Sequence, residues 1–436
     1  MIRREPLADA VDRLRDGRID PAAYVDELEA RAATVEPAIE SLVPEDGRWD
    51  RLRDEAAALA ERYPDPAERP PLYGIPVGVK DIFHVAGLPT RAGSDLPPEA
   101  LAGEEAAAVT AVRDAGALVL GKTVTTEFAH FEPGPTRNPH DTGRTPGGSS
   151  SGSVAAVAAG LCPVAFGTQT IGSVIRPAAF CGIVGFKPSF GRIPTDGVIP
   201  LSESVDHVGV FTQDTEGIGL VTPLLCDSWR TLPTPTAAPT LGVPDGPYLE
   251  QASETGRDAF ESHVDALVGA GYDVVRVDAL SDIDAVNERH ERLVAAEAAL
   301  AHESWFREYD DRYAAETRRL VSEGMETTMD TVAAGRRSRT ELRGALTAQM
   351  DEHGIDLWIA PAAPGAAPEG IETTGDPIMN LPWTHAGLPT ITVPASRTEE
   401  GLPLGVQCVG RFGADEDVVR WSHGISEAFS SAFAVP

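Results

Sequence analysis

The chain of 436 residues carries 67 acidic and 36 basic side chains, which gives a net charge of −31. An apolar share of 42% is typical of a globular protein with a substantial core, and the excess of acid disfavours nonspecific binding to nucleic acid. No apolar run reaches the length of about 18 residues that a transmembrane helix needs, and residues 1–6 lack the apolar core of a signal peptide. We therefore expect a cytoplasmic protein that binds neither membrane nor nucleic acid.

Lysine is almost absent: it occurs only as Lys80, Lys122 and Lys187, so that 33 of the 36 basic residues are arginine. Acid excess combined with scarce lysine resembles a halophilic protein from a salt-loaded cytoplasm, where screening weakens charge repulsion. A dedicated basic partner is the alternative, but the sequence has no compact acidic block. Where surface lysine is nearly eliminated, each remaining lysine needs a specific role.

The cysteines are widely scattered and form no CxxC pair, which predicts neither a disulfide framework nor a zinc site. We interpret them as small buried apolar residues rather than as nucleophiles. They are Cys162, Cys181, Cys226 and Cys408.

Residues 1–65 are predicted to form an N-terminal helical segment. Asp20 followed by Pro21 is typical of a helix start, and Tyr24, Leu28 and Ala32 recur at helical spacing. Such a segment packs against a core or against a partner subunit, which leaves a homodimer open.

Alternating strand and helix patterns begin after residue 70. Residues 75–79 (IPVGV) and 118–122 (LVLGK) predict buried strands, and residues 104–115 predict a helix between them, as in an α/β fold. Residues 147–153 (GGSSSGS) precede a small-residue helix and then a strand at 163–166. We interpret this serine cluster as a tight turn at a helix start.

The second half of the chain repeats the α/β pattern. Residues 181–194 predict short strands with tight turns, and the Pro/Thr-rich residues 231–239 predict a connection and a candidate boundary. A helix is expected near 258–267, and residues 283–350 predict a charged, variable helical region. Further strands are expected at 208–212, 241–243, 272–277, 357–361, 390–394 and 406–410, before a final helix.

Two arrangements could activate a serine, which needs a base and fixed donors for an oxyanion. The first is the nucleophile elbow G-x-S-x-G, which residues 148–152 match with Ser150 at the centre. That motif needs a preceding strand, and residues 142–146 (TGRTP) are a poor one. The second is a serine–serine–lysine arrangement in which burial keeps Lys80 neutral. A buried ion pair of Lys80 with Asp81 is the alternative for this lysine.

Three motifs carry a family resemblance. Residues 78–81 (GVKD), 147–150 (GGSS) and 167–173 (GTQTIGS) resemble, in order and spacing, the linked motifs of the amidase signature family. The resemblance is strong over a motif core of about residues 70–215 and continues in outline near the C-terminus. It implies an amidase signature domain over residues 66–436, with a mixed central β-sheet flanked by helices on both faces.

The resemblance also implies a role for each motif. Ser173 would be the acylated nucleophile, Lys80 the base, and Ser149, held in an unusual cis peptide, the proton relay between them. The backbone N–H groups implied to form the oxyanion hole are those of Thr170, Ile171, Gly172 and Ser173.

Two positions depart from the family pattern. The family usually has aspartate where Gln169 stands, and the GTQT form marks one branch. It usually has glycine where Ile171 stands, and a β-branched residue is strongly disfavoured at positive φ. We therefore expect ordinary φ at Ile171, with its side chain lining or narrowing the pocket. A non-catalytic scaffold, in which Ile171 closes the oxyanion hole, is the alternative.

Other residues are candidates for contacts around the site. Arg176 follows the nucleophile by three positions and, in this family, supports the site or contacts substrate, a substrate carboxylate being one candidate partner. Trp383 and His385 are candidates for the substrate pocket, with core packing as the alternative. His130 and His140 lie on the loop before the serine cluster and are candidates for its entrance, although polar loop residues are the plainer interpretation.

The pair Asp206-His207 suggests a Ser-His-Asp triad, but the family implies that this aspartate orders the local scaffold. Lys122 and Lys187 are expected to be structural partners, and Ser153 to fix the serine loop.

Together these features predict an amidase that hydrolyses a small carboxylic acid amide to the acid and ammonia or an amine, without metal or organic cofactor. The alternative within the family is the A subunit of a glutamyl-tRNA amidotransferase. The GTQT form, the arginine at plus three and the somewhat short chain count against that alternative.

Overall fold

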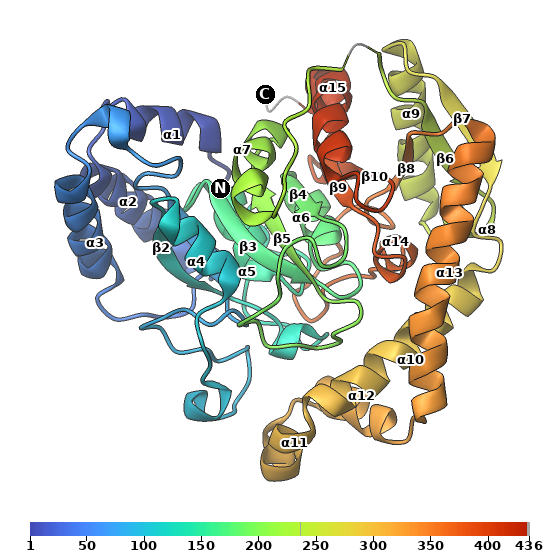
Figure 1. The fold of residues 1–436 in the computed structure, drawn as a ribbon, viewed down its shortest axis with the longest axis horizontal. Coiled ribbons are helices and arrows are strands. Elements are labelled where there is room, and N and C mark those ends of the chain that lie inside the picture. Colours follow the sequence, from blue (N-terminus) through green and yellow to red (C-terminus); the bar gives the residue numbers. More distant parts are fainter. Residues whose placement is uncertain (236, 434–436) are drawn as a thin grey trace.

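The computed structural model describes residues 1–235 and 237–433, and these form a single mixed sheet of ten strands with helices around it (Figure 1). The strands are β1 (Pro76–Lys80), β2 (Leu118–Thr123), β3 (Val164–Gln169), β4 (Val184–Lys187), β5 (His207–Thr212), β6 (Leu241–Asp245), β7 (Val274–Asp278), β8 (Leu357–Pro361), β9 (Thr390–Arg397) and β10 (Pro403–Val409).

The strand order is β2-β1-β3-β5-β4-β9-β10-β8-β6-β7. The two edges of the sheet are parallel, with β1 between β2 and β3 and with β6 between β7 and β8. The centre, from β3 through β5, β4, β9 and β10 to β8, is antiparallel. The predicted mixed sheet is confirmed.

Helices cover both faces of the sheet. The helices are α1 (Leu7–Arg15), α2 (Pro21–Ile39), α3 (Arg48–Arg62), α4 (Ala107–Asp114), α5 (Ser151–Ala158), α6 (Ile175–Cys181), α7 (Thr215–Leu225), α8 (Pro247–Glu250), α9 (Glu254–Gly269), α10 (Ile283–Ala301), α11 (Glu303–Tyr309), α12 (Ala315–Met325), α13 (Met329–His353), α14 (Leu381–His385) and α15 (Asp415–Phe433). Short 3₁₀ helices are η1 (Pro66–Glu68), η2 (Pro98–Leu101), η3 (Glu127–Ala129) and η4 (Asp310–Arg312).

Alternating side chains along each strand build two apolar layers, as the pleat of a strand requires. In β2, Leu118 and Leu120 join the layer formed with α5 and α6, whereas Val119 joins the layer formed with α4, α7, α9 and α15. In β3, Ala165 and Phe166 divide between the same two layers. The sheet is therefore buried on both faces, as predicted.

The N-terminal helical segment packs at the β2 edge of the sheet (Figure 1). The Asp20 carboxylate accepts a hydrogen bond from the Ala22 N–H at 2.9 Å, so the predicted helix cap is confirmed. Tyr24 and Leu28 are fully buried in the same apolar layer as β1 and β3. The segment shares the core of the sheet.

Two expectations for the connections need correction. Residues 191–194 form turns rather than a strand, because their chain bends directly after β4 without a pairing partner in the described chain. Residues 231–239, of which residue 236 lies outside the described ranges, connect α7 to β6. Strands on both sides of this connection belong to one sheet, so it does not separate two sheets.

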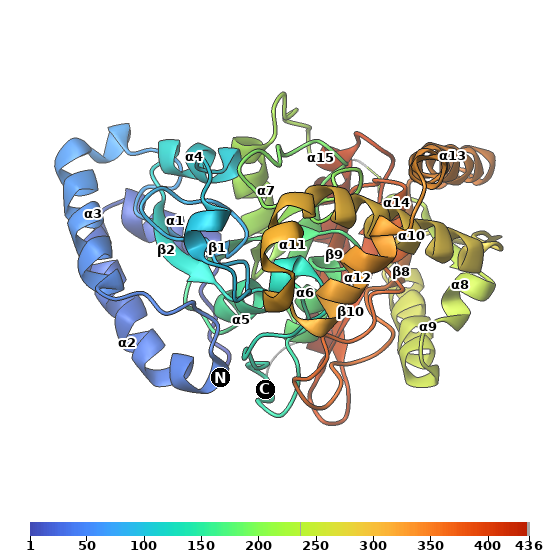
Figure 2. The same cartoon turned by 90° about the horizontal axis from the view of Figure 1, so that it is seen from below.

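Helices α10 to α13, residues 283–353, form an extension that we call the helical arm. In Figure 1 its tip lies below the sheet, and in the view from below α11 and α12 lie in front (Figure 2). The Trp305 indole N–H donates to the Ala100 carbonyl at 2.9 Å, which ties the tip to the loop between β1 and α4. Within the described residues no helix is long and apolar enough to cross a membrane.

Candidate active site

Lys80 stands at the carboxyl end of β1, between the two parallel neighbours of that strand. Its side chain is fully buried, and its Nζ atom donates hydrogen bonds to Ser149 Oγ at 2.7 Å and Thr168 Oγ1 at 2.8 Å. Burial holds the pKa of Lys80 well below its usual range, with Asp206 opposing that shift. A lysine so placed is neutral more readily than any surface lysine.

The two other lysines are also buried, at 4% exposure for Lys122 and 0% for Lys187. Lys122 forms an ion pair with Asp81 at 2.7 Å. The alternative in which Lys80 pairs with Asp81 is therefore wrong for this structure. Lys187 donates to the Leu388 carbonyl, and burial lowers its pKa to about 7. Lys122 and Lys187 contact protein groups, as their expected structural roles require.

The serine cluster forms the start of α5, as predicted. The Gly148–Ser149 peptide bond is cis, as the family resemblance implied. Ser150 is fully buried and exchanges 3.3 Å hydrogen bonds with the backbone of Thr168, away from the site surface. Ser153 donates to the Phe166 carbonyl at 2.7 Å and so ties α5 to β3. Ser149 is thus the cluster member that reaches Lys80.

Ser149 and Ser173 meet in one small pocket of about 20 Å³, which we call the catalytic pocket. Its walls come from the loop after β2, the serine cluster, the turn after β3 and the segment before α14. The lining residues are Ala129, His130, Phe131, Ser149, Thr170, Ile171, Ser173, Arg176, Leu201, Thr374 and Pro377.

The turn between β3 and α6 is held from both sides. The Gln169 side-chain oxygen accepts from the N–H groups of Val174 at 2.7 Å and Ile175 at 2.9 Å, and its amide N–H donates to Thr384 Oγ1 at 2.9 Å. Thr384 in turn donates to the Ile171 carbonyl at 2.6 Å. Gln169 therefore clamps the turn in which the nucleophile candidate sits.

This turn leaves its own N–H groups free. Across the described chain, the backbone N–H groups of residues 170–173 have no hydrogen-bond acceptor. Ile171 does not have positive φ, which confirms the expected ordinary backbone there, and its half-buried side chain lines the catalytic pocket. Free N–H groups beside a serine are the donors that a developing oxyanion requires.

Asp206 and His207 do not form a triad with Ser173. The Asp206 carboxylate accepts hydrogen bonds from the N–H groups of Leu201 and Ser202 and from the Thr170 hydroxyl at 2.6 Å. The His207 Nδ1–H donates to the Val205 carbonyl. Asp206 orders the backbone next to the site, as the family resemblance implied.

Arg176 lines the catalytic pocket although its side chain is only 1% exposed. Its guanidinium donates to the carbonyls of Gly148 at 2.7 Å and Gly375 at 2.6 Å and to the Thr374 hydroxyl at 3.1 Å. It forms no ion pair within the described residues, and burial lowers its pKa to about 9, with Asp376 opposing that shift. An unpaired buried cation beside the serines can attract an anion.

Trp383 and His385 do not line the catalytic pocket. The Trp383 indole N–H donates to the Tyr248 hydroxyl at 2.8 Å, and the side chain is fully buried. His385 is also fully buried, between His290 at 3.1 Å and Ser338 at 2.7 Å. Both residues occupy the core beneath the site, which was the alternative to a substrate contact.

One wall of the catalytic pocket is attached to the helical arm. The Glu127 carboxylate accepts from the Ala314 N–H at 3.0 and 3.1 Å, and the Phe128 ring stacks on Tyr313 at 5.2 Å between centroids. Phe128 and Ala129 both adopt positive φ, at 47° and 61°. The arm therefore holds a turn of unusual backbone conformation against the pocket.

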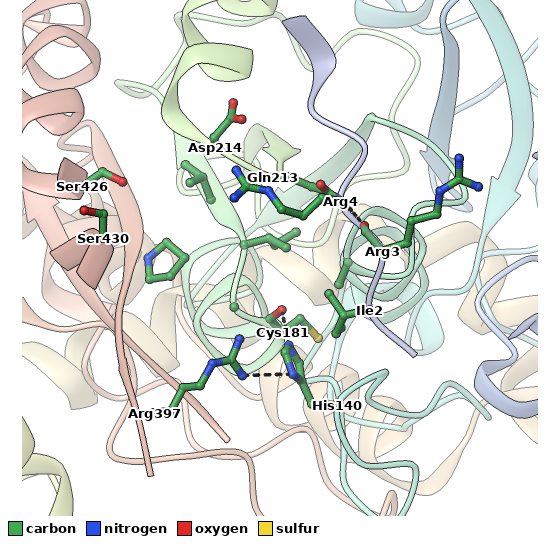
Figure 3. A pocket seen from close by; sticks show the side chains of 15 residues that line it. Ile2, Arg3, Arg4, His140, Cys181, Gln213, Asp214, Arg397, Ser426 and Ser430 are labelled. Atoms are coloured by element: carbon green, nitrogen blue, oxygen red, sulfur yellow. Dashed lines mark hydrogen bonds between the residues drawn. The ribbon is translucent and has the colours of Figure 1, made fainter. Parts of the chain in front are cut away.

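The two loop histidines, His130 and His140, lie in different pockets. His130 lines the catalytic pocket, and burial lowers its pKa to about 4, which makes it a neutral group. His140 lies instead in a separate pocket of about 250 Å³, where its Nε2 faces the Cys181 carbonyl at 3.0 Å and its Nδ1 faces Arg397 (Figure 3). Of the two candidates for the entrance, only His130 lines the catalytic pocket, and His140 is a polar loop residue, which was the plainer interpretation.

Several site residues were missed by the sequence interpretation, chiefly Thr168, Thr384 and Leu201. Thr168 belongs to a quoted motif and follows the stretch of β3 that pairs with β1, so its nearness to Lys80 could have been inferred from a parallel pairing. Thr384 and Leu201 lie far along the chain and carry no pattern that points to the site. The four cysteines are free and buried, as expected.

Comparison with known proteins identifies the family of this chain. The family model described as Amidase matches residues 23–419. AtzE, a component of the 1-carboxybiuret hydrolase of Pseudomonas sp. (strain ADP), is 33% identical, over 83% of this chain and 85% of that protein. The A subunit of the glutamyl-tRNA(Gln) amidotransferase of Koribacter versatilis (strain Ellin345) is 28% identical, over 93% of this chain and 97% of that protein.

A crystal structure of an amidase is similar throughout, with a TM-score of 0.88, 34% identity and coverage of 97% of this chain and 99% of the other. The similarity therefore spans both the sheet and the helical arm. The chain belongs to the amidase family and is an enzyme of the hydrolase class that acts on amide C–N bonds.

Proposed function

We propose that this chain hydrolyses a small carboxylic acid amide through an acyl-enzyme on Ser173, with Ser149 as relay and Lys80 as base. One observation carries the proposal: Lys80 is fully buried, and its Nζ atom contacts the Ser149 and Thr168 hydroxyls instead of a carboxylate. An amine kept neutral in this way can accept a proton at ordinary pH.

In the proposed acylation step, Ser173 Oγ attacks the amide carbon and passes its proton to Ser149, whose own proton moves to Lys80. The N–H groups of residues 170–173 stabilise the oxyanion, and a single such donor typically contributes about 2.7–4 kcal/mol. When the C–N bond breaks, the proton returns through Ser149 to the departing nitrogen. Water then attacks the ester by the same relay, which releases the acid and restores the Ser173 hydroxyl.

The substrate is proposed to carry a carboxylate that Arg176 contacts. Arg176 is a buried cation at the catalytic pocket that forms no ion pair in the described chain, although the Asp376 carboxylate partly offsets the effect of its burial. The volume of the pocket, about 20 Å³ before any adjustment, favours a small acyl group. The name of the related 1-carboxybiuret hydrolase indicates a carboxyl group on the substrate of that protein.

An acyl-trapping assay tests the proposal. Amide pairs that differ only in a terminal carboxylate are incubated with hydroxylamine, and the hydroxamate is quantified. The carboxylate-bearing member should react faster, and Arg176→Met should remove that preference. No hydroxamate from any amide, at low or high salt, would contradict the hydrolase and favour the scaffold alternative.

The A subunit of a glutamyl-tRNA amidotransferase is the second candidate, because a protein of that name is 28% identical over most of both lengths. Glutamine turnover that occurs only after the other amidotransferase subunits have been supplied would favour it.

Light scattering of the purified chain decides between a monomer and a homodimer, and cell fractionation tests the proposed cytoplasmic location.

A further inference from the structure

A larger polar cavity adjoins the catalytic pocket and has no role in the steps above. Its volume is about 360 Å³ against about 20 Å³ for the catalytic pocket. Ala129, Thr170 and Leu201 line both spaces, so the two are separated by single side chains. The other lining residues are Ile82, Thr168, Thr195, Asp196, Val198, Ile199, Pro200, Glu203, Asp206 and His207. We call this space the acidic cavity.

The acidic cavity is lined by a residue that contacts the proposed proton relay. Thr168 lines the cavity, and its Oγ1 atom accepts the 2.8 Å hydrogen bond from Lys80. The same lysine Nζ atom lies 2.7 Å from Ser149 Oγ, the group proposed to protonate the departing nitrogen. At the other end, Asp196 and Glu203 are exposed to solvent. The cavity therefore extends from Thr168, next to Lys80, to a solvent-exposed mouth that carries two carboxylates.

The lining offers acceptors and negative charge. It contains three carboxylates and no lysine or arginine among the described residues. His207 is 2% exposed, and its Nδ1–H donates to the Val205 carbonyl. Burial lowers the pKa of His207 well below its usual range, so its imidazole is neutral and adds no positive charge to the lining. Such a lining fits a donor-rich cation.

We propose that the acidic cavity is the subsite for the amine side of the substrate and the exit of the leaving amine, an inference that rests on the proposed function. Acylation forms the Ser173 ester bond, breaks the C–N bond and delivers one proton to nitrogen, which yields a neutral amine. That amine gains a second proton from water and becomes a cation, which the carboxylates at the mouth attract. Substrates with a positively charged amine side are favoured over neutral ones of the same size.

Acyl transfer from the acyl-enzyme to added amines tests this subsite. The acyl donor is 4-nitrophenyl acetate, and the added nucleophiles, which compete with water, are monoprotonated ethylenediamine and n-propylamine. The concentration of neutral, nucleophilic amino groups is the same for both. The two have the same length, but only the diamine carries a charged tail. The wild-type chain should form the diamine amide in preference. The double variant Asp196→Asn, Glu203→Gln should reduce that preference about two- to fivefold, as expected for exposed charge pairs.

The matched control is Glu303→Gln with Asp310→Asn, which removes the same charge from the tip of the helical arm outside the cavity. An unchanged preference in the cavity variant, or an equal loss in the control, would overturn the proposal. Calorimetric titration of Ser173→Ala with ethylenediamine tests the cavity without any catalysis. Binding that weakens in the cavity variant supports the subsite even if amide turnover fails, and absence of binding contradicts it even if turnover succeeds.

Discussion

The ammonium group of Lys122 lies 2.7 Å from Asp81, whereas Lys80 forms no ion pair in the described chain and only the field of Asp206 opposes the effect of its burial. Two lysines of similar burial thus have opposite surroundings. Desolvation acts on both, but only Lys122 has a direct ionic partner to offset it. This difference assigns Lys122 a structural role and leaves Lys80 as the lysine proposed to take up and release a proton.

Lys80→Ala and Ser173→Ala should each abolish turnover while the protein stays folded. When several groups act as one relay, removal of any single member lowers kcat by about 10³-fold or more. Turnover is measured on an amide identified by the trapping assay, and folding by circular dichroism. If the Ser173→Ala variant retained activity, Ser173 could not be the nucleophile.

Activity and stability should both depend on pH through Lys80. Since burial lowers its pKa in the folded chain, kcat/KM should rise with pH as the neutral amine forms. Between that lowered pKa and the ordinary value of 10.5, the unfolded chain binds more protons, so the free energy of unfolding should also rise with pH. Lys80→Met should remove this part of the rise. A flat activity profile from mildly acidic to alkaline pH would argue against a lysine base.

Gly172→Ala should disrupt the turn that carries the free N–H groups. A Cβ atom at this position would lie 2.4 Å from Asn380 Oδ1 and 2.8 Å from Pro377 Cβ, so the turn must shift. We expect at least about a hundredfold loss of kcat from the displaced donors. Gly344→Ala is the control, because its Cβ would meet nothing within 4 Å on α13 and should leave kcat unchanged. Equal kcat in both variants would contradict a catalytic role for this turn.

Glu127→Ala should loosen the pocket wall that the helical arm holds. Removal of the carboxylate leaves the Ala314 N–H without its acceptor, a loss of about 1–3 kcal/mol for a buried group. We expect a higher KM with a smaller change in kcat, since this wall lines the catalytic pocket but contains no member of the proposed relay. Steady-state kinetics compare this variant with Glu326→Ala, which changes an exposed glutamate on the same arm. A change in kcat alone would place Glu127 in the chemistry instead.

Folding should depend strongly on salt. With a net charge of −31, screening relieves repulsion between carboxylates, so the melting temperature should rise by about 3–5 °C between low and molar KCl, equivalent to a few kcal/mol for a chain of 436 residues. Sucrose at matched osmolality is the control, because it stabilises by exclusion without screening charge. A melting temperature indifferent to molar salt would remove the halophilic interpretation of the composition.

Local patterns predicted most of the fold correctly. The apolar run at 75–79 and the small-residue helix after the serine cluster were placed within a few residues of β1 and α5. Both elements can be located from local sequence alone, because the spacing of their apolar residues and the residues at their ends are local features. Residues 191–194 were misjudged because their tight turns resemble strand ends in sequence.

The sequence could not predict contacts made by residues far apart along the chain. Nothing local indicates that Thr384 reaches the Ile171 carbonyl or that Glu127 caps the start of α12. For the same reason the sequence could not decide where His140 lies, since its position depends on Arg397 and Cys181. The family resemblance of the motifs identified the candidate catalytic residues, but the residues that line the catalytic pocket around them are brought together only by the tertiary structure.

The burial of all three lysines changes how the protein can be handled in the laboratory. Reagents that acylate accessible primary amines, such as N-hydroxysuccinimide esters, find no lysine side chain more than 4% exposed on the folded chain. The unfolded chain offers three of them. The number of lysines labelled, read by mass spectrometry, therefore reports the fraction of molecules that have opened, and coupling through lysine is unsuitable for attaching the native enzyme to a surface.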